Sequence, residues 1–366
     1  MKKVLFLIHD LGQGGAEKVL VNLVNNMDPE QFDITVMALF GGGVNAQFLK
    51  PHIRLITCHK RVRRGNVHIM KLLSPKQLYR HYIKERYDLI VSYLEGSCAR
   101  IVSGCTDPAV KTVAWIHCAM RSERDLAVGF RSAAEAKACY ARFDRGVFVS
   151  RSVWETFRNY CPMKHMQVLY NTNESDRILQ KADEEAVLPG EGFHWCGVGK
   201  LVSSKGFDRM IRIQKRLVEE GYTAHFLALG EGKLRPMLER YIRDNGLTDC
   251  VTLLGYQTNP YKYVAKCDLF VCASHLEGFS TAATEALIVG TPVCTVEVSG
   301  MKEMLGEHNE WGIVTDNDEE ALYRGIKGLL DDPELLAHYK EKAAERGRSF
   351  SMENTVRAVE EMLLSL

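Results

Sequence analysis

The stretch "DLFVCASHLEGFSTAATEALIVGTPVCTV", residues 268–296, contains the pattern that decides the fold of this chain. An apolar run leads through a short loop into a helical pattern, and a second apolar run follows "GTP". Both runs are apolar throughout instead of alternating with polar residues, which is typical of strands covered on both faces of a parallel sheet. The stretch therefore predicts a strand–helix–strand unit of a doubly wound α/β domain.

The same alternation runs along the whole chain. Helical patterns at Ala16–Met27, Pro75–Tyr87, Phe207–Glu220 and Leu234–Asn245 separate short apolar runs. The runs are "VLFLI", "FDITVMAL", "DLIVSYL", "KTVAWI" and "RGVFVS" in the first half and "HWCGVG", "AHFLALG", "CVTLLG", "DLFVCAS" and "TPVCTV" in the second. The first run is too short for a signal peptide and is followed by Asp10, so we interpret it as a strand.

A polar, acidic stretch that ends in Pro and Gly, residues 171–192, separates the two series. We therefore expect an N-terminal Rossmann-like domain at 1–175, a linker at 176–192, a second domain at 193–347 and a C-terminal helix at 348–366. The last helix needs an apolar surface to cover, because it carries apolar residues at helical spacing: Met352, Val356, Val359, Met362 and Leu363.

Composition bounds the possible functions. With 366 residues, 46% of them hydrophobic, the chain has enough material for two domain cores. Its formal net charge of +1 gives no overall attraction to polyanions, so we expect no nucleic-acid partner. No segment has the roughly 20 apolar residues that span a bilayer. Eleven cysteines without a Cys-x-x-Cys pair indicate reduced thiols in a cytoplasmic protein.

Two glutamates flank the predicted helix start within the opening stretch. Ser280 or Thr281 is a suitable N-cap, and the free N–H groups of a helix start favour an anion such as a diphosphate. Glu277 precedes the helix and can accept hydrogen bonds from sugar hydroxyls, whereas Glu285, inside it, can bind a ribose diol. The same spacing recurs elsewhere, as in Glu231 and Glu239, so the surrounding pattern carries the specificity.

The stretch "GVGKLVSSKGFDRMI", residues 197–211, places Lys200 and Lys205 in a loop between a predicted strand and a helix. Two ammonium groups at the carboxyl edge of a sheet can neutralise a diphosphate without a metal ion. The alternative is a solvated loop, which is the usual environment of lysine.

The first predicted strand leads into a glycine loop that contains Gly12, Gly14 and Gly15. The loop is not a dinucleotide fingerprint, because Glu17 stands where the third glycine would be, but it lets backbone approach a phosphate or a sugar. His117 ends another predicted strand, where it is either structural or directed into a cleft.

Two further features have competing interpretations. The Asp-x-Asp within "TDNDEE", residues 315–320, suggests a metal site, but a helix follows and N-capping explains it better. The basic, partly apolar segment at residues 50–86 is either a solvated face, a contact for anionic membrane lipid, or a binding surface for a diphosphate-linked acceptor. Its cations include Arg54, Lys60, Arg61, Arg63, Arg64, Lys71, Lys76, Arg80, Lys84 and Arg86.

Together these motifs resemble family 4 of the glycosyltransferases, retaining enzymes of the GT-B fold, in which two Rossmann-like domains face a cleft. The resemblance covers nearly the whole chain. It is carried by the Glu277 to Glu285 element and by "GKLVSSKG", "GGAEKV", "LGEGKLRPML", "LLGY" and "VLYNT". It also implies that the N-terminal domain is the acceptor side, that the C-terminal domain binds the nucleotide sugar, and that the C-terminal helix crosses back onto the N-terminal domain.

The resemblance implies roles for individual residues. Lys205 and Lys200 would bind the diphosphate of a nucleotide-sugar donor, although family members usually carry Arg at the position of Lys200, and Glu285 would bind the ribose. His117 would face the transferred sugar from the opposite domain, and His117, Lys205 and Glu277 would be the catalytic residues. The other implied donor-binding residues are Gly14 and Gly15 over the diphosphate, Gly255 and Tyr256 near the base, and Glu277 with the backbone of Gly278, Phe279, Ser280 and Thr281 around the sugar and phosphates.

The activity that the resemblance implies is transfer of a hexosyl or N-acetylhexosaminyl group, with retention, from a nucleotide sugar, with a UDP-sugar as the expected donor. We expect no metal requirement, a front-face mechanism, and a saccharide or lipid-linked glycan of bacterial surface-polysaccharide biosynthesis as acceptor. The protein would meet the inner face of the plasma membrane if residues 50–86 bind lipid. The alternatives are a sugar-nucleotide epimerase or hydrolase and a non-catalytic sugar-nucleotide-binding protein.

Overall fold

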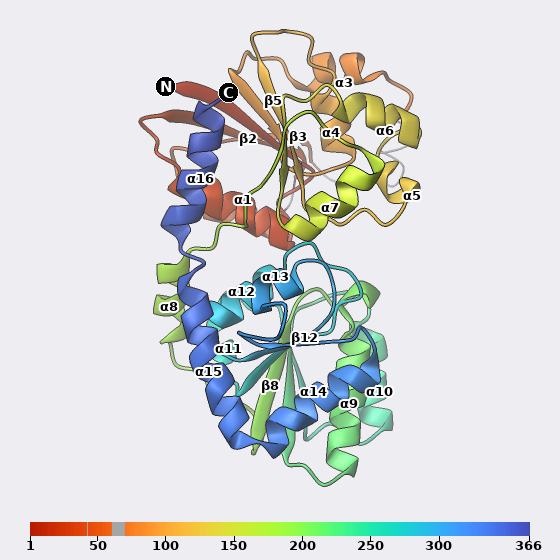
Figure 1. Cartoon of the computed structure of the whole chain (residues 1–366), viewed down its shortest axis with the longest axis vertical. Coiled ribbons are helices and arrows are strands. Elements are labelled where there is room, and N and C mark those ends of the chain that lie inside the picture. Colours follow the sequence, from red (N-terminus) through yellow and green to blue (C-terminus); the bar gives the residue numbers. More distant parts are fainter. Residues whose placement is uncertain (42, 61–69) are drawn as a thin grey trace. The chain divides into compact units, whose positions relative to one another are not determined.

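The computed structural model describes residues 1–41, 43–60 and 70–366. The chain divides into two units, which are described separately (Figure 1). The N-terminal unit comprises Met1–Thr172 together with Glu353–Leu366, and the C-terminal unit comprises Asn173–Met352.

In the N-terminal unit the described residues form a seven-stranded parallel sheet in the order β3-β2-β1-β4-β5-β6-β7. The strand order reverses at β1, which pairs with β2 on one side and β4 on the other. In an open α/β sheet such a reversal creates a crevice at the carboxyl ends of the strands. The strands are β1 (Lys2–Ile8), β2 (Phe32–Phe40), β3 (Arg54–His59), β4 (Leu89–Ser92), β5 (Lys111–Ile116), β6 (Arg145–Phe148) and β7 (Met166–Val168).

The N-terminal unit includes the last helix of the chain. On its buried stripe α16 carries Val356, Val359, Met362 and Leu363, four of the five predicted residues, whereas Met352 is only half-buried. Lys2 Nζ donates to the Leu363 carbonyl at 3.1 Å. The return of the C-terminal helix to this unit is thereby confirmed. The helices are α1 (Gly15–Asn26), η1 (Val44–Phe48), α3 (Pro75–Tyr82), α4 (Ser97–Val102), α5 (Glu123–Leu126), α6 (Ala133–Tyr140), α7 (Arg151–Tyr160) and α16 (Met352–Leu364).

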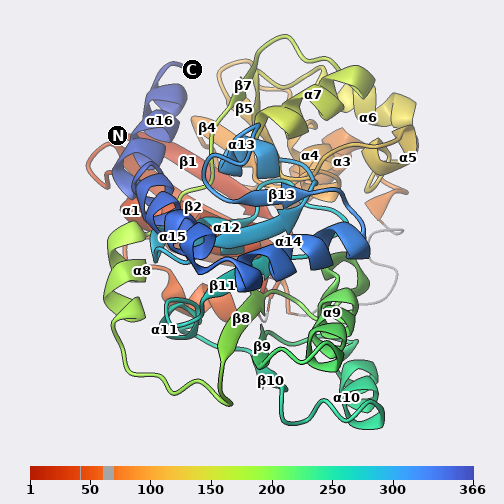
Figure 2. The same ribbon diagram turned by 60° about the horizontal axis from the view of Figure 1, so that its bottom comes forward.

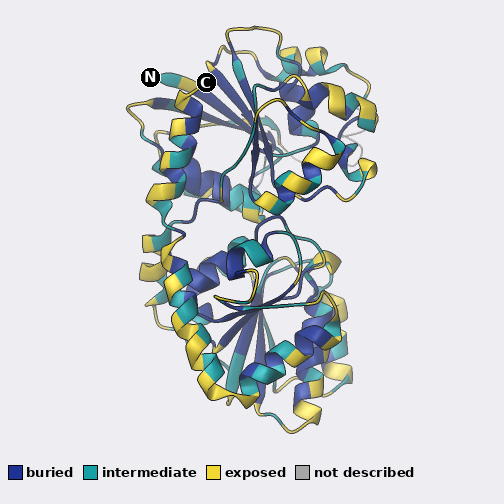
Figure 3. Ribbon diagram, in the orientation of Figure 1, coloured by how far each residue is buried: buried dark blue, intermediate teal, exposed yellow. Residues whose placement is uncertain are grey.

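The C-terminal unit contains a six-stranded parallel sheet among its described residues, in the order β10-β9-β8-β11-β12-β13. Strands β9, β11 and β12 are buried along their whole length (Figure 3), which is why their sequences are apolar without alternation, whereas the edge strands β10 and β13 are mostly half-buried. The strands are β8 (Phe193–Val198), β9 (Ala224–Leu229), β10 (Val251–Gly255), β11 (Leu269–Cys272), β12 (Val293–Val296) and β13 (Ile313–Thr315).

Helices cover both faces of this second sheet. Helices α9 and α14 contact each other on one face, whereas α8, α11, α12 and α15 pack together on the other (Figures 1 and 2). Helix α8 lies within the stretch predicted as a linker and groups with the C-terminal unit, and residues 183–192 follow it without helix or strand. The helices are α8 (Ser175–Ala182), η2 (Ser203–Lys205), α9 (Phe207–Glu219), α10 (Arg235–Asp244), α11 (Tyr261–Val264), α12 (Thr281–Ile288), α13 (Met301–Leu305), α14 (Glu319–Asp331) and α15 (Pro333–Arg348).

The structure confirms the predicted fold class of two Rossmann-like α/β domains. All eleven cysteines are free thiols. Among the described residues, no helix combines the length and the apolar character that crossing a bilayer would require.

Candidate functional site

The loop after β8 holds Lys205 against the loop after β11. Gly206, which links η2 to α9, has a φ of +67°, and a Cβ there would lie 2.1 Å from the carbonyl oxygen of Ala273. The His275 N–H donates to the Ser204 carbonyl at 2.8 Å. Glycine at position 206 permits this conformation and this close approach of the two backbones. The close approach and the hydrogen bond together fix the two loops to each other.

The two loops bring Lys205 and Glu277 into an ion pair. Lys205 Nζ lies 2.5 Å from Glu277 Oε1, and the Ser274 hydroxyl donates to the same oxygen at 2.6 Å. The Glu277 side chain is 11% exposed and that of Lys205 is 32% exposed. Two residues that sequence analysis predicted to be catalytic are therefore in direct contact, and Ser274 fixes the carboxylate that they share.

The start of α12 lies directly after Glu277. The Ser280 hydroxyl accepts a hydrogen bond from the Ala283 N–H at 3.4 Å, which confirms the predicted N-cap. The Phe279 ring is buried against Phe350, with ring centroids 6.1 Å apart. A Cβ on Gly300, which has a φ of +80°, would lie 2.6 Å from the Gly278 carbonyl oxygen. These contacts hold the backbone from Gly278 to the first turn of α12.

Glu285 lies within α12 and is 5% exposed. The Tyr261 hydroxyl, from α11, donates to Glu285 Oε1 at 3.3 Å. A buried carboxylate needs hydrogen-bond partners, and Tyr261 supplies one of them.

The loops after β8, β9 and β10 interlock through glycines. Gly230, with a φ of +152°, has no room for a Cβ, which would lie 1.8 Å from the Gly199 carbonyl oxygen. The Gly230 N–H donates to the Gly255 carbonyl at 2.8 Å, and Gly255 has a φ of +73°. Lys200 is exposed, as is Tyr256 at 39%. These predicted residues therefore lie on loops at the same carboxyl edge of the sheet as Lys205 and Glu277.

In the N-terminal unit the glycine loop leads into a helix N-terminus, as predicted. Gly14 is the N-cap of α1 and Gly15 is its first residue. A Cβ on Gly14 would lie 1.8 Å from a carboxylate oxygen of Glu17, so that side chain folds back over the start of its own helix. The acid that breaks the dinucleotide fingerprint therefore occupies the space beside Gly14.

His117 directly follows β5 and is buried. Its N–H donates to Glu95 Oε2 at 3.1 Å, and its ring lies 4.9 Å from that of Tyr93. Its Nε2 has no hydrogen-bond partner among the residues that the structure describes. Burial lowers the pKa of His117 to about 3, so the imidazole is neutral at ordinary pH.

The Asp-x-Asp segment caps a helix. Asp318 is the N-cap of α14, and its Oδ1 accepts a hydrogen bond from the Ala321 N–H at 2.7 Å. This confirms the capping interpretation. Within residues 1–41, 43–60 and 70–366, no group of three or more His, Cys, Asp or Glu side chains has the arrangement of a metal site.

Three residues of the site were missed by the sequence analysis: Ser274, Tyr261 and Arg209. Arg209 is 3% exposed on α9, and its Nε donates to the Ala273 carbonyl at 2.7 Å. An arginine beside apolar Met210 and Ile211 is the signal that could have indicated it. Nothing in the sequence marks Ser274 or Tyr261, because their partners are set by packing.

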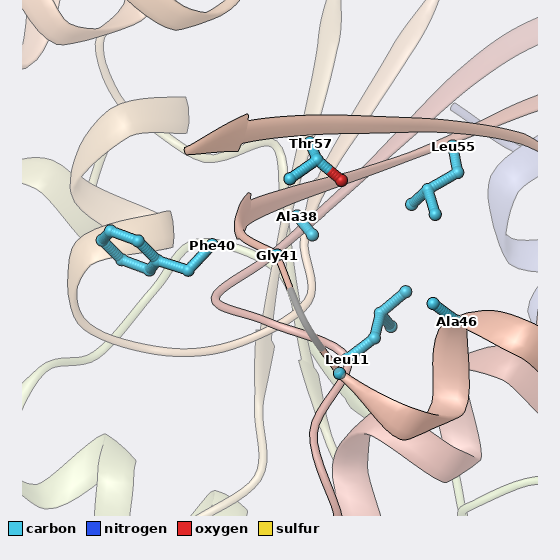
Figure 4. Close-up of a pocket in the computed structure, with 8 residues that line it drawn as sticks. Leu11, Ala38, Phe40, Gly41, Ala46, Leu55 and Thr57 are labelled. Atoms are coloured by element: carbon cyan, nitrogen blue, oxygen red, sulfur yellow. The ribbon is translucent and has the colours of Figure 1, made fainter. Parts of the chain in front are cut away.

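A small, open hollow of about 20 Å³ lies in the N-terminal unit, between the loop after β1, helix η1 and strands β2 and β3 (Figure 4). Its lining side chains are apolar except for that of Thr57. The lining residues are Leu11, Ala38, Phe40, Gly41, Gly43, Ala46, Leu55 and Thr57.

Two parallel-sheet units, one of them with lysines, glutamates and a helix N-terminus at its carboxyl edge, are the architecture expected of a glycosyltransferase of the GT-B fold. Comparison with known families agrees. The model described as "Glycosyl transferases group 1" matches residues 180–346, and that described as "Glycosyltransferase Family 4" matches residues 13–177. The chain belongs to the family 4 glycosyltransferases.

Similar proteins match along nearly their full length. The chain is 29% identical to N-acetylgalactosamine-N,N'-diacetylbacillosaminyl-diphospho-undecaprenol 4-alpha-N-acetylgalactosaminyltransferase of Campylobacter jejuni, over 96% of each chain. The crystal structure of Anabaena HepE in complex with UDP and glucose has a TM-score of 0.80 at 20% identity and covers 100% of both chains. Sucrose-phosphate synthase of Thermosynechococcus elongatus has a TM-score of 0.80 at 15% identity, over 100% of this chain and 99% of that one.

Proposed function

We propose that this glycosyltransferase moves a hexosyl or N-acetylhexosaminyl group from a UDP-sugar to a hydroxyl of a saccharide or lipid-linked glycan, with retention of the anomeric configuration. The observation that carries the proposal is the contact between Lys205 and Glu277 beside the start of α12. This contact supports a role for Lys205 as the cation that meets the diphosphate and for Glu277 as the carboxylate that meets the sugar hydroxyls.

The proposed chemistry follows from the leaving group. A nucleoside diphosphate departs readily when preorganised donors meet its growing negative charge. Lys205, Lys200 and the first N–H groups of α12 lie on loops at one edge of the sheet and can supply that charge compensation without a metal ion. In a front-face route the departing phosphate oxygen helps to take the proton of the acceptor hydroxyl, so the enzyme needs no nucleophile.

Two relatives support the choice of substrates. Anabaena HepE, which shares the fold, has been crystallised with UDP and glucose, and this supports a UDP-sugar donor. The Campylobacter jejuni relative is named for transfer of N-acetylgalactosamine to an undecaprenol-linked saccharide, and this supports an amino-sugar donor and a lipid-linked acceptor.

A turn in the N-terminal unit supports contact with an anionic membrane. Two arginines hold this turn by donating to the backbone carbonyls of residues 70–73. Arg100 donates to the carbonyls of residues 70 and 73, and Arg131 donates to those of residues 71 and 72. Glu135 pairs with both arginines. The turn thereby holds Leu72 78% exposed, ahead of basic helix α3. Arg61, Arg63 and Arg64 of the same segment lie outside the described residues.

The test is a thermal-shift panel of UDP-, GDP-, ADP- and TDP-sugars with and without EDTA, since a ligand that binds the folded state raises Tm. Sugars that shift Tm are then incubated with p-nitrophenyl glycosides and lipid-linked saccharides, and the product anomer is read by NMR. A selective, EDTA-insensitive shift with a retained product is expected. Donor breakdown or epimerisation without transfer would favour an epimerase or hydrolase. Donor binding without any turnover would favour a non-catalytic sugar-nucleotide-binding protein.

A further inference from the structure

A histidine–aspartate pair at the carboxyl end of β1 has no role in the function proposed above. His9 Nδ1 lies 2.7 Å from Asp10 Oδ2, directly after the last residue of the strand. The two side chains are 35% and 30% exposed. The pair is therefore formed at the surface, where a ligand can reach it.

The carboxylate of the pair is fixed by a second contact. Asp10 Oδ1 accepts a hydrogen bond from the Gly12 N–H at 2.7 Å. Asn45, from η1, braces the same loop, because its N–H donates to the Leu11 carbonyl at 2.9 Å and its side-chain amide donates to the Gly12 carbonyl. Asp10 therefore presents its other oxygen to His9 in a defined direction.

This contact sets the tautomer of His9. An ionised carboxylate only accepts hydrogen bonds, so Nδ1 must carry the proton, and the neutral ring then has an unprotonated Nε2. The ring packs on Phe40, with centroids 4.9 Å apart, which restricts its rotation. No described residue is hydrogen-bonded to Nε2. The arrangement leaves one oriented hydrogen-bond acceptor at the surface.

The pair lies where the topology favours a ligand. β1 is the strand at which the order of the N-terminal sheet reverses, with β2 on one side and β4 on the other. Ligands of open α/β sheets bind in the crevice at the carboxyl ends of such strands. Leu11, two residues after His9, lines the apolar hollow (Figure 4), so the same loop offers a polar and an apolar contact. A saccharide presents both kinds of surface.

We infer that His9 binds the acceptor saccharide, with Nε2 accepting a hydrogen bond from one of its hydroxyls, and that Asp10 acts as a positioning residue which sets the His9 tautomer. The inference rests on the proposed function, because it names a residue that would contact the acceptor of that reaction. In this role His9 selects acceptors that carry a hydroxyl at the matching position.

The experiment compares His9→Phe, His9→Gln and Asp10→Asn with the wild type, using a UDP-sugar and p-nitrophenyl glycoside that give transfer in the screen above. His9→Phe keeps a ring on Phe40 but removes the acceptor atom, and we expect the KM for the glycoside to rise about tenfold while kcat changes less. His9→Gln should recover much of the loss, because its amide oxygen can accept the same hydrogen bond.

Asp10→Asn tests the positioning role. Its amide oxygen can still accept from Gly12, but its NH₂ group now faces Nδ1, so the proton moves to Nε2 and the acceptor atom is lost. We expect a KM increase like that of His9→Phe, and a change of tautomer in the ¹⁵N spectrum of the His9 ring. Deoxy-glycosides identify the hydroxyl. Removal of the hydroxyl that His9 binds should weaken binding of the glycoside to the wild type, but should make no difference to its binding to His9→Phe.

The outcomes separate this inference from the proposed function. Unchanged donor-induced Tm shifts with a raised glycoside KM in His9→Phe support the inference. An unchanged KM in His9→Phe, or a loss confined to kcat, overturns it while transfer by the wild type still stands. An absence of transfer by the wild type with every donor and glycoside overturns the proposed function itself and the inference with it.

Discussion

Lys205 Nζ lies 2.5 Å from Glu277 Oε1, although the two residues are 72 positions apart in the sequence. The contact joins the loop after β8 to the loop that precedes α12. In the proposed function one partner meets the diphosphate and the other the sugar. A change at either residue therefore alters the electrostatic environment of both parts of the donor.

Replacing Lys205 by Gln should lower kcat by about 100-fold or more, because it removes a cation from the leaving diphosphate and leaves Glu277 without its charge partner. Steady-state transfer assays at saturating donor measure this. Lys215→Gln is the matched control, since Lys215 forms an ion pair of 2.8 Å with Glu219 on exposed helix surface. Near-normal turnover of the Lys205 variant would reject the assigned role.

Replacing Glu285 by Ala should weaken donor binding by about 1–3 kcal/mol, through loss of hydrogen bonds to the ribose. Calorimetric titration with UDP measures the effect. Tyr261→Phe is the companion variant, because it removes the hydroxyl that lies 3.3 Å from the carboxylate while keeping the ring. An unchanged UDP affinity in Glu285→Ala would exclude a ribose-binding role.

Gly206→Ala should destabilise the C-terminal unit and reduce activity, because a Cβ would lie 2.1 Å from the Ala273 carbonyl oxygen. Gly246→Ala is a suitable control: its φ is +66°, almost the same as at Gly206, but no atom lies within 4 Å of its Cβ position. Backbone strain alone costs about 1 kcal/mol at both sites. Thermal denaturation should show the larger loss for Gly206→Ala, and equal losses would contradict the close approach.

His117 should make stability fall as the pH falls below about 6.5. Burial lowers its pKa to about 3 in the folded state, so the unfolded chain binds this proton first, and stability is lost as the pH falls from 6.5 toward 3. Between pH 7 and pH 5 the loss is about 2 kcal/mol. Urea unfolding of wild type and His117→Phe at both pH values isolates this contribution, which should be absent in the variant. If the stability of wild type and of His117→Phe depended on pH in the same way, His117 would have the same pKa in the folded and the unfolded chain.

Leu72→Glu should reduce binding to vesicles that contain anionic phospholipid, because it replaces the 78% exposed apolar side chain with a negative charge. Vesicle sedimentation measures the bound fraction. Val187→Glu makes the same kind of change at a residue that is 89% exposed in the C-terminal unit, and it should bind like wild type. Equal effects of the two changes would indicate a general charge effect instead of a lipid-binding turn.

Local sequence predicted the elements well. Apolar runs without alternation identified strands of parallel sheets, and hydroxyl and acidic residues before helical patterns identified the caps at Ser280 and Asp318. These features depend on neighbours in the chain, so the sequence states them directly. The same reasoning placed the predicted donor-binding residues of the C-terminal unit at one edge of its sheet.

Contacts between distant segments could not be predicted. Tyr261 reaches Glu285 because α11 packs beside α12. Arg209 reaches the Ala273 carbonyl, directly after β11, because the start of α9 lies at the same edge of the sheet. The pair of His9 and Asp10 is local, yet adjacent residues in extended chain usually point to opposite faces. Only the turn of the chain after β1 brings the two side chains together.

Helix α16 gives the N-terminal unit an unusual order of assembly during synthesis. Residues 1–172 leave the ribosome long before residues 353–366, so the apolar surface that α16 covers stays open until those later residues have been made. The C-terminal unit is continuous in sequence from Asn173 to Met352 and can complete its core earlier. A ribosome that stalls before residue 353 therefore releases a finished second unit joined to an unfinished first one, with exposed apolar surface that chaperones and proteases recognise.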